Sequence, residues 1–477
     1  MNVEIFKIGG SILTETLAFN RAAEIVDEKL VKGTLPVCVV SAMKGVTDKI
    51  ITSIDNCLKE PEYHPEDFVE ELKREHLNIL PGGIKEDELV KEFEKLLQVL
   101  NYIKSSGELT GSVHAYAVSR GENFTSRLLS CYLDSKNIEN VCFYGEDLII
   151  TDDNSFEATV ELSETRENLE KLLLPQIKNG LVPIIAGFSG RSKNGSITIL
   201  GRGGTDDTAV SIGFGLGVKK VVKYVIEEGI MNIDPKFLKE VEDNNFYDYN
   251  LFKTLPKPRI VPYLSYVEAS ELLREERTKV VHYKVLDPLM KGNIELHINN
   301  YYNNDQGTVV SKVEEAFYED NKPRPKAISY QRNLSGITFL PIQSLSPCEV
   351  YANVFSALAE EKVDVRYVSM SGYQISLLVP EEHHKKAMKR LSHLDIALEV
   401  FPMKGNKGTF SVVGSEMRGM KGFFSKITGV LASHGVNIEQ ATQPNSENII
   451  RFGLADDDIP IAVAAVYDEL FNGDQYK

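Results

Sequence analysis

The sequence lacks the features that mark membrane proteins, secreted disulfide scaffolds and the common metal sites. No run reaches the roughly 18 apolar residues that a membrane span needs, and the most apolar stretch, 459–466, contains Pro460. The first ten residues hold no apolar run behind a basic flank, so we expect no signal peptide. The five cysteines are scattered without a CxxC pair, which predicts a reducing, cytoplasmic setting and structural thiols. The nine histidines show no HExxH spacing, and we expect no protein-only metal site.

The composition is that of a globular protein with more than one core. The chain has 477 residues, of which 42% are hydrophobic and 26% are charged, and this length predicts two or three domains. The formal net charge of −16 disfavours general binding to nucleic acid or to anionic membranes, because both are themselves negatively charged. A local basic pocket is still compatible with this charge.

Hydrophobic patterning divides the chain into an α/β part and an α+β part. In the first 320 residues short β-branched runs alternate with longer amphipathic ones, which predicts a mainly parallel sheet covered by helices on both faces. The predicted strands are 3–8, 35–41, 141–144, 182–188 and 220–225, and the predicted helices are 16–31, 46–58, 65–104, 115–133, 163–174 and 208–215. Prolines and basic residues at 321–326 predict a linker. Beyond it, two similar strand-and-helix units separated at 403–408 predict a paired α+β module.

A glycine-containing segment follows the first predicted strand. It comprises Lys7, Gly9, Gly10 and Ser11. Its glycines allow backbone N–H groups to approach an anion and its lysine adds a full charge, so phosphate is the natural ligand. A tight turn with an exposed lysine is the alternative interpretation. The segment is not a Walker loop, because GxxxxGK[ST] occurs nowhere in the chain.

Hydroxyl and carboxylate groups occur at two further positions. Ser41 and Thr47 lie in SAMKGVTD after the second predicted strand, at the sheet edge where open α/β sheets bind ligands. Capping of the following helix is the alternative role for these two side chains. Glu122, in SRGE near a helix start, is suited to hold an ammonium group, unless it is a solvated helix residue.

The most specific segment is LGRGGTDD at 200–207. Its three glycines allow Arg202 and the backbone to approach a small ligand, and arginine can clamp a carboxylate with two hydrogen bonds. Thr205 and Asp206 are placed to cap the next helix. The alternative is a glycine-rich hairpin turn.

These four segments, in this order, resemble the aspartate kinase branch of the amino acid kinase family. The likeness continues through GFSGRSKNGSITILGRGGTD and GIMNIDPK, and GSEMRGMKGFFSKITGVLASHGVNI resembles an ACT module. The resemblance implies a catalytic domain at 1–322 and ACT-like regulatory modules at 323–403 and 404–477. The implied architecture is an α/β three-layer sandwich followed by two ferredoxin-like α+β modules.

The resemblance also implies a role for each matching residue. Lys7 would contact the transferred phosphoryl group and Asp206 would position Lys7. The phosphate and nucleotide would be bound by Gly9, Gly10, Ser11, Gly229, Asp234, Lys236 and Lys279, and aspartate by Ser41, Thr47, Glu122, Arg202 and Thr205. Glu122 would hold the ammonium group of aspartate, and Arg202 its α-carboxylate.

The implied reaction transfers the γ-phosphoryl group of MgATP to the side-chain carboxylate of L-aspartate. This carboxylate is already ionised at neutral pH, since its reference pKa is about 3.9, so the site needs no general base. The difficulty is repulsion between two anions, which Mg²⁺, Lys7 and backbone amides would relieve. The product, 4-phospho-L-aspartate, leads to lysine, threonine and methionine.

The nucleotide segment departs from the family pattern. The family carries Thr-Asp-Val-x-Gly-Ile-Tyr-Thr-x-Asp-Pro-Arg where this chain has VIEEGIMNIDPK at 225–236, so Val225-Ile226 replaces Thr-Asp and Met231 replaces Tyr. We expect weakened or redirected nucleotide recognition. Two alternatives to an active aspartate kinase follow: a regulatory homologue with little or no catalysis, and a kinase of another acidic amino acid such as glutamate.

The C-terminal modules imply an amino-acid effector. Ser344 and Asp364 are placed to meet a small amino acid at a module interface, and the resemblance suggests lysine or threonine, bound where modules of two chains pair. A homodimer or higher oligomer is therefore expected. Modules that only dimerise are the alternative.

Overall fold

The computed structural model divides the chain into two compact units. It describes residues 2–80, 86–243, 255–273, 280–303, 306–312, 325–341, 346–371, 374–394, 398–403, 405–417, 419–446 and 448–472. The first unit comprises 1–230, 262–273 and 279–314, and the second comprises 231–261, 274–278 and 315–477. The predicted linker at 321–326 falls largely outside the described residues.

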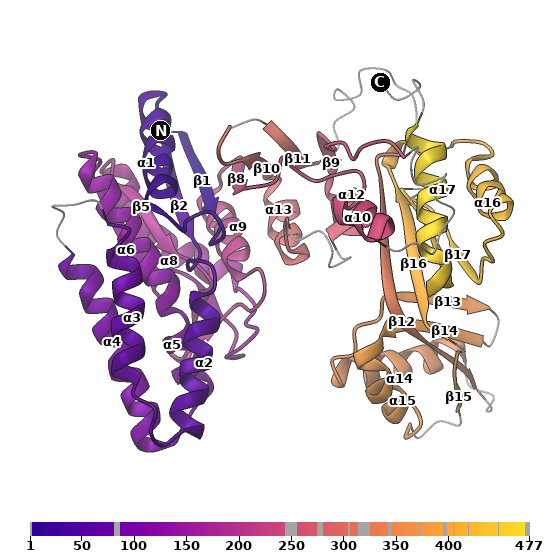
Figure 1. Ribbon diagram of the computed structural model, residues 1–477, viewed down its shortest axis with the longest axis horizontal. Coiled ribbons are helices and arrows are strands. Elements are labelled where there is room, and N and C mark those ends of the chain that lie inside the picture. Colours follow the sequence, from indigo (N-terminus) through magenta and orange to yellow (C-terminus); the bar gives the residue numbers. More distant parts are fainter. Residues whose placement is uncertain are drawn as a thin grey trace. The chain divides into compact units, whose positions relative to one another are not determined.

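The first unit is built on a mainly parallel sheet of eight strands (Figure 1). In spatial order these strands are β3 (Asn140–Tyr144), β5 (Val182–Ala186), β2 (Thr34–Val40), β1 (Asn2–Ile8), β8 (Lys220–Val225), β10 (Glu295–Asn300), β11 (Gln306–Ser311) and β9 (Tyr263–Ser265). Pairing is parallel except between β10 and β11. A smaller sheet contains β4 (Ile150–Thr151), β6 (Ser189–Ser192) and β7 (Ile197–Ile199). This is the predicted α/β class, and the carboxyl ends of the central parallel strands point to one edge.

Helices cover both faces of the large sheet. They are α1 (Thr16–Val31), α2 (Val46–Lys59), α3 (Pro65–Leu77), α4 (Asp87–Ser106), α5 (Gly111–Val118), α6 (Arg120–Ser135), α7 (Gly145–Leu148), α8 (Leu162–Lys178), α9 (Gly204–Leu216), α12 (Tyr266–Leu273) and α13 (Leu286–Gly292), with a 3-10 turn at Tyr283–Val285. Helices α1 and α6 pack together and against β2, whereas α8 and α9 pack together and α9 lies against β1 and β8. The result is a three-layer sandwich.

Side chains of the central strands point alternately to the two faces of the sheet, and this determines which helical layer each residue contacts. Phe6 and Ile8 of β1 belong to the core that contains α1 and α6. Ile5 of β1 and Val221 of β8 lie instead under Gly213 of α9. Because successive side chains of a strand point to opposite faces, Lys7 and Lys223 share the α9 face.

Four predicted elements of this unit are corrected by the structure. The helix predicted at 65–104 is two helices, α3 and α4. The helix predicted at 208–215 begins at Gly204, so Asp206 lies in its first turn and not before it. The helix predicted at 115–133 is two helices, α5 and α6, which Ser119 separates. The strand predicted at 182–188 ends at Ala186, because the chain turns at Phe188, whose φ of 73° does not suit a strand.

The second unit contains one antiparallel sheet with helices packed against it. Its strands are β12 (Ala327–Pro341), β13 (Tyr367–Ser371), β14 (Gln374–Pro380), β15 (Leu398–Pro402), β16 (Lys407–Val413), β17 (Gln440–Thr442) and β18 (Ile449–Ala455). Its helices are α10 (Pro235–Asp243), α14 (Pro347–Glu360), α15 (Glu381–Leu391), α16 (Phe423–Ser433) and α17 (Ile459–Phe471), with 3-10 turns at Ser415–Met417 and Asp456–Asp458. One core forms around α14 and α15, and another around α16 and α17. The predicted pair of α+β modules is thus confirmed.

Strand β12 joins the two modules into one sheet (Figure 1). Its first part, from Ala327, pairs with β16, and its last part, up to Pro341, pairs with β14 and β15. The register shifts between Gln331 and Leu334, where Asn333 has a φ of 58°. This irregularity lets one strand serve both modules.

One segment that the sequence assigns to the catalytic domain lies in the second unit. Residues 231–261 belong to the second unit, where Ile233 and Phe237 pack in the α16 and α17 core. The Asn232 carbonyl accepts a hydrogen bond from the Ile328 amide. The domain boundaries at 322 and 403 stay predictions.

None of the helices in the described ranges is both long enough and apolar enough to cross a membrane.

Candidate active site

Two loops meet where β1 and β2 end. Gly10 lies so close to the β2–α2 loop that a Cβ atom at this position would be 1.9 Å from the Ala42 carbonyl oxygen. The Lys44 amide donates a hydrogen bond to the Gly10 carbonyl at 3.0 Å. The predicted phosphate segment and the predicted hydroxyl segment are therefore in contact, and the contact requires glycine at position 10.

The same region receives the start of α6. A Cβ atom on Gly121 would lie 2.8 Å from the Ala42 Cβ atom, so the first turn of α6 packs directly on the β2–α2 loop. Glu122 follows in this turn and is 4% exposed. Burial raises the pKa of Glu122 to about 8, against the opposing effects of backbone hydrogen bonds and Lys7. Its Oε2 atom accepts no hydrogen bond within the described part of the chain.

The start of α9 forms the third side of this region, beside the loops after β1 and β2 and the start of α6. Gly203 is the N-cap residue in the left-handed conformation, with a φ of 77°. The predicted capping by Thr205 or Asp206 is therefore wrong, because α9 begins before them and its first residue has no side-chain cap. Thr205 packs against Gly187, just beyond the end of β5. The N-terminal end of α9 carries a partial positive charge, which favours an anion nearby.

Asp206 joins two buried lysines at this helix start. Lys7 Nζ lies 3.0 Å from Asp206 Oδ1, and Lys223 Nζ forms an ion pair with Asp206 Oδ2. Lys7 and Lys223 are direct register partners on β1 and β8. Burial opposes ionisation of Asp206, but the two ammonium groups prevail and lower its pKa to about 2. Burial lowers the pKa of Lys223 to about 8, although Asp206 acts in the opposite direction.

A buried ion network supports the start of α6. Arg120 is 1% exposed and donates hydrogen bonds to Glu92 of α4 and Glu146 of α7. Glu146 also accepts a hydrogen bond from Ser189 of β6, and Tyr144 donates one to Glu92. Each buried charge of this group is paired, which such burial requires. The network fixes the helix start on which Glu122 lies.

The remaining substrate and phosphate candidates lie on the loops around this centre. Gly9 is beside Lys7, since a Cβ atom at Gly9 would be 3.5 Å from Lys7 Nζ. Ser41 is partly buried, and its amide donates a hydrogen bond to the Ile8 carbonyl. Ser11 and Arg202 are exposed at the ends of their loops. Thr47 is partly buried in the first turn of α2.

The nucleotide candidates do not all belong to the same unit. Gly229 lies in the first unit, whereas Asp234 and Lys236 lie in the second. Asp234 Oδ1 accepts a hydrogen bond from the Lys236 amide at 2.9 Å and so caps α10. Lys236 is exposed. Lys279 lies outside the described residues.

Of the effector candidates, only Asp364 is described, since Ser344 is not among the described residues. The Asp364 carboxylate pairs with Arg366 at 2.6 Å. Its backbone amide donates a hydrogen bond to His383 Nδ1 of α15. Asp364 is therefore already engaged within its own module.

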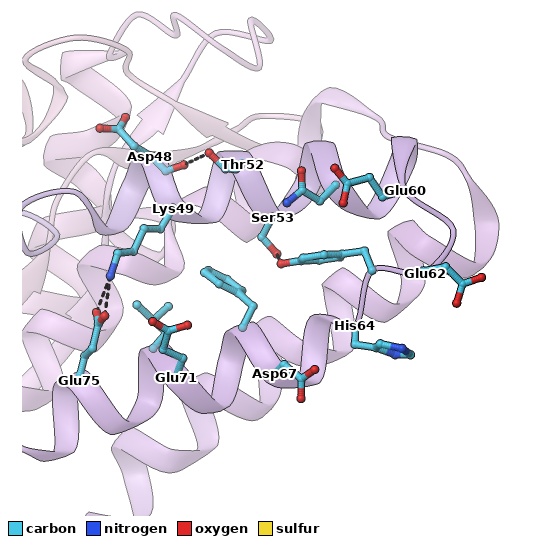
Figure 2. A pocket seen from close by; sticks show the side chains of 14 residues that line it. Asp48, Lys49, Thr52, Ser53, Glu60, Glu62, His64, Asp67, Glu71 and Glu75 are labelled. Atoms are coloured by element: carbon cyan, nitrogen blue, oxygen red, sulfur yellow. Dashed lines mark hydrogen bonds and ion pairs between the residues drawn. The ribbon is translucent and has the colours of Figure 1, made fainter.

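A separate pocket of about 750 Å³ lies between α2 and α3 (Figure 2). Ser53 and Tyr63 are hydrogen-bonded there, and Lys49 pairs with Glu75 across the two helices. The acidic lining residues are Asp48, Glu60, Glu62, Asp67, Glu71 and Glu75. None of the predicted site residues lines this pocket.

Sequence reasoning missed Lys223 and Arg120. Lys223 interrupts the apolar interior of β8 at the position that matches Lys7, and this interruption is the signal that could have found it. Arg120 lies inside the quoted SRGE segment, but its partners come from helices far away in the sequence.

Comparison with known proteins identifies the family. The sequence model of the amino acid kinase family matches residues 2–300, and the model of the ACT domain matches 346–393 and 410–470. The chain therefore belongs to the amino acid kinase family and carries ACT domains.

Curated relatives extend over nearly the whole chain. Aspartokinase 2, a chloroplastic protein of Arabidopsis thaliana, is 26% identical over 490 residues, which cover 98% of this chain and 84% of that protein. Lysine-sensitive aspartokinase 3 of Escherichia coli is 22% identical over 479 residues, which cover 98% of this chain and 99% of that protein.

Solved structures share the fold. E. coli aspartokinase III in complex with aspartate and ADP has a TM-score of 0.78 at 21% identity, covering 98% of this chain and 100% of that chain. Aspartate kinase of Clostridium acetobutylicum has a TM-score of 0.73 at 21% identity, with the same coverage. At these identities the likeness concerns the fold.

Proposed function

We propose that this chain is an ATP-dependent aspartate kinase that makes 4-phospho-L-aspartate. The observation that carries the proposal is the buried group of Lys7 and Asp206 at the start of α9, next to the buried carboxyl group of Glu122. The first two supply a fixed positive charge for a phosphoryl group, and the third is suited to an ammonium group. The aspartokinase relatives that align with 98% of the chain support the same reaction.

Each group has a defined task in the proposed reaction. Lys7, held by Asp206, stabilises negative charge on the γ-phosphoryl group, and backbone amides around Gly9 and Gly10 bind the phosphates. An oxygen of the aspartate side-chain carboxylate attacks phosphorus, the bond to the ADP oxygen breaks, and the pair of electrons leaves with ADP. No residue has to remove a proton, because the attacking carboxylate is already ionised.

The amino acid is held at its α-carbon end. Glu122 binds the ammonium group of aspartate, and Arg202, at the exposed edge of the site, binds the α-carboxylate with two hydrogen bonds. Ser41, Thr47 and Thr205 line the remaining polar surface. A substrate ammonium group next to Glu122 favours the ionised carboxylate, so binding lowers the pKa that burial raises.

Mg²⁺ enters this proposal with the nucleotide. The described part of the chain contains no group of three or more His, Cys, Asp or Glu side chains arranged to hold a metal ion. Mg²⁺ commonly keeps several waters and binds substrate phosphates, and there it would neutralise charge that develops during transfer. We assign no residue of this chain as its ligand.

The second part of the chain is proposed to be regulatory. We infer a catalytic domain at 1–322 and ACT modules at 323–403 and 404–477, with lysine or threonine as effector and a homodimer or larger oligomer as the assembly. The ACT match at 346–393 and 410–470 supports the two regulatory modules, and the name of the relative lysine-sensitive aspartokinase 3 supports lysine as an effector. The scattered free cysteines support a reducing compartment, and we propose the cytoplasm.

The test is trapping of the acyl phosphate with hydroxylamine. The protein is incubated with MgATP and L-aspartate, with L-glutamate as a parallel acceptor and MgGTP as a parallel donor. We expect aspartyl hydroxamate that depends on ATP and disappears in Lys7→Ala. A protein that forms more glutamyl hydroxamate than aspartyl hydroxamate would be a kinase of another acidic amino acid.

A regulatory homologue gives a different result. It would form no hydroxamate with either acid or either nucleotide, yet it would bind lysine or threonine in calorimetry. The Val225-Ile226 and Met231 departures motivate this alternative, because they replace polar and aromatic nucleotide contacts.

A further inference from the structure

We propose that Lys223 is a second phosphate-site lysine of the kinase: through Asp206 it fixes the position of Lys7, and in its protonated form it attracts the transferred phosphoryl group. This inference rests on the proposed function. It concerns a residue that the motif-based assignment of the site does not include.

The geometry places Lys223 and Lys7 as a pair. They occupy directly opposite register positions of the parallel strands β1 and β8 and share the α9 face of the sheet. One carboxylate, Asp206, binds both ammonium groups with its two oxygens. Asp206 therefore cannot turn toward one lysine without loosening its contact to the other.

The charges of this group do not balance. Two ammonium groups and one carboxylate leave one positive charge, although the three side chains are only 9–11% exposed. A buried net charge is unfavourable unless a counter-ion arrives, and the α9 N-terminus adds further partial positive charge. This group of three side chains is therefore suited to bind an anion.

The neighbouring acidic residues do not supply this counter-charge. The charged groups that influence Lys223 are Asp206 on α9, Lys7 on β1 and Glu227 beyond the end of β8. Glu227 is exposed and solvated. Glu122 is near Lys7 but is held mainly protonated by burial. A phosphoryl group is thus the natural partner of the excess charge.

Protonation of Lys223 offers a readout that a purely structural lysine would not give. Burial lowers its pKa to about 8, so the free enzyme loses this charge in an accessible pH range. The quantity to measure is kcat/KM for MgATP at saturating aspartate, between pH 6.5 and 10. Saturating aspartate keeps Glu122 ionised, so its titration does not enter this profile.

The variants are Lys223→Arg and Lys223→Met. The wild-type profile is expected to fall above about pH 8, whereas Lys223→Arg, whose guanidinium keeps its charge, moves this decline upward by more than one pH unit. Lys223→Met is expected to lose about 100-fold in kcat/KM, the lower end of the loss from removing one donor to a developing anion. In Lys223→Met the decline near pH 8 disappears.

Lys220→Met is the matched control. Lys220 lies on the same strand and pairs with Glu4, away from Asp206. We expect this variant to keep the wild-type profile and to stay within about threefold of wild-type activity, because Lys220 does not contact Asp206 and Glu4 keeps its second partner, Lys29.

Two results would overturn the inference. One is a Lys223→Met enzyme with activity and pH profile like those of Lys220→Met, and the other is a decline near pH 8 that Lys223→Arg does not move. If Lys223→Met does not fold, the arginine variant decides. If the wild type forms no acyl phosphate at all, the proposed function fails separately. Calorimetry of MgADP binding in a Glu122→Gln background, which removes the titration of Glu122, then decides: affinity should fall above about pH 8 with Lys223 and not with Lys223→Arg.

Discussion

Glu122 makes aspartate binding a proton-releasing event. In the free protein its buried carboxyl group has a pKa of about 8, so at pH 7 about nine molecules in ten carry the proton. A bound ammonium group favours the carboxylate and displaces this proton. We therefore expect about 0.9 proton to be released for each aspartate bound at pH 7, as binding linkage requires.

The assay is titration calorimetry of aspartate at pH 7 in two buffers of different ionisation enthalpy. The difference in observed binding enthalpy between the buffers gives the number of protons released. Glu122→Gln serves as the control, since it keeps the shape of the side chain without the proton. Equal enthalpies in both buffers for the wild type would refute the assignment of Glu122 to the ammonium group.

A second measurement on Glu122 needs no ligand. Below pH 4.5 the carboxyl group is protonated in both the folded and the unfolded chain, and between 4.5 and about 8 only the unfolded chain loses the proton. Stability of the wild type relative to Glu122→Gln should therefore fall as the pH rises through this window and level off above it. Across the full window the free energy of unfolding should fall by on the order of 5 kcal/mol, at 1.36 kcal/mol per pH unit. Urea titrations that show no trend across this window would contradict the burial of an unpaired carboxyl group.

Three further predictions concern single substitutions. Lys7→Ala should lose about 2.7–4 kcal/mol of transition-state stabilisation in the hydroxamate assay; retained activity would exclude Lys7 from the phosphate site. Gly10→Ala should abolish activity because its Cβ atom would lie 1.9 Å from the Ala42 carbonyl oxygen, whereas Gly9→Ala, whose Cβ atom would lie 3.5 Å from Lys7 Nζ and 3.9 Å from Ser11 Oγ, should fold and bind nucleotide; equal melting temperatures for the two variants would contradict this close contact. Arg120→Met should reduce the free energy of unfolding by about 3–5 kcal/mol, because it leaves two buried carboxylates without their shared partner, and urea denaturation with an unchanged midpoint would show that the network is dispensable.

The local pattern of apolar and polar residues is sufficient to predict most of the helices and strands. The predicted strand at 220–225 and the predicted helices at 16–31 and 46–58 agree with β8, α1 and α2 to within one residue, because long apolar or amphipathic runs dominate there. The start of α9 was placed four residues too late. Gly204, Thr205 and Asp206 are poor helix formers by themselves, and packing of this turn against Gly187 and Phe188 outweighs their propensity.

Long-range pairing was not accessible to sequence reasoning. The sequence predicts two separate strand-and-helix units in this half of the chain, and it does not reveal that one strand, β12, runs through both and is paired with β16 in its first half. Residues 231–236 belong to the predicted nucleotide segment, yet Asn232 accepts hydrogen bonds from the Ile328 amide and from the Tyr467 hydroxyl. These contacts join segments about 100 and 235 residues apart, which no local pattern encodes.

The site was predicted where it depends on short motifs and missed where it depends on strand neighbours. Lys7, Glu122 and Asp206 lie in recognisable segments, and the structure brings them together. Lys223 lies between apolar neighbours in β8, outside any motif, and its relation to Lys7 appears only once β1 and β8 are known to be adjacent.

Because strand β12 belongs to both modules, it limits which sequence changes the protein can tolerate in evolution. Since one strand pairs with β14, β15 and β16, loss of either module would expose strand edges of the other, and such edges favour aggregation. A single-residue insertion on one side of the shift between Gln331 and Leu334 would exchange the inner and outer faces of half the sheet. We therefore expect the two modules to be retained together, and changes in this half of the chain to be tolerated best in the loops that leave β12 untouched.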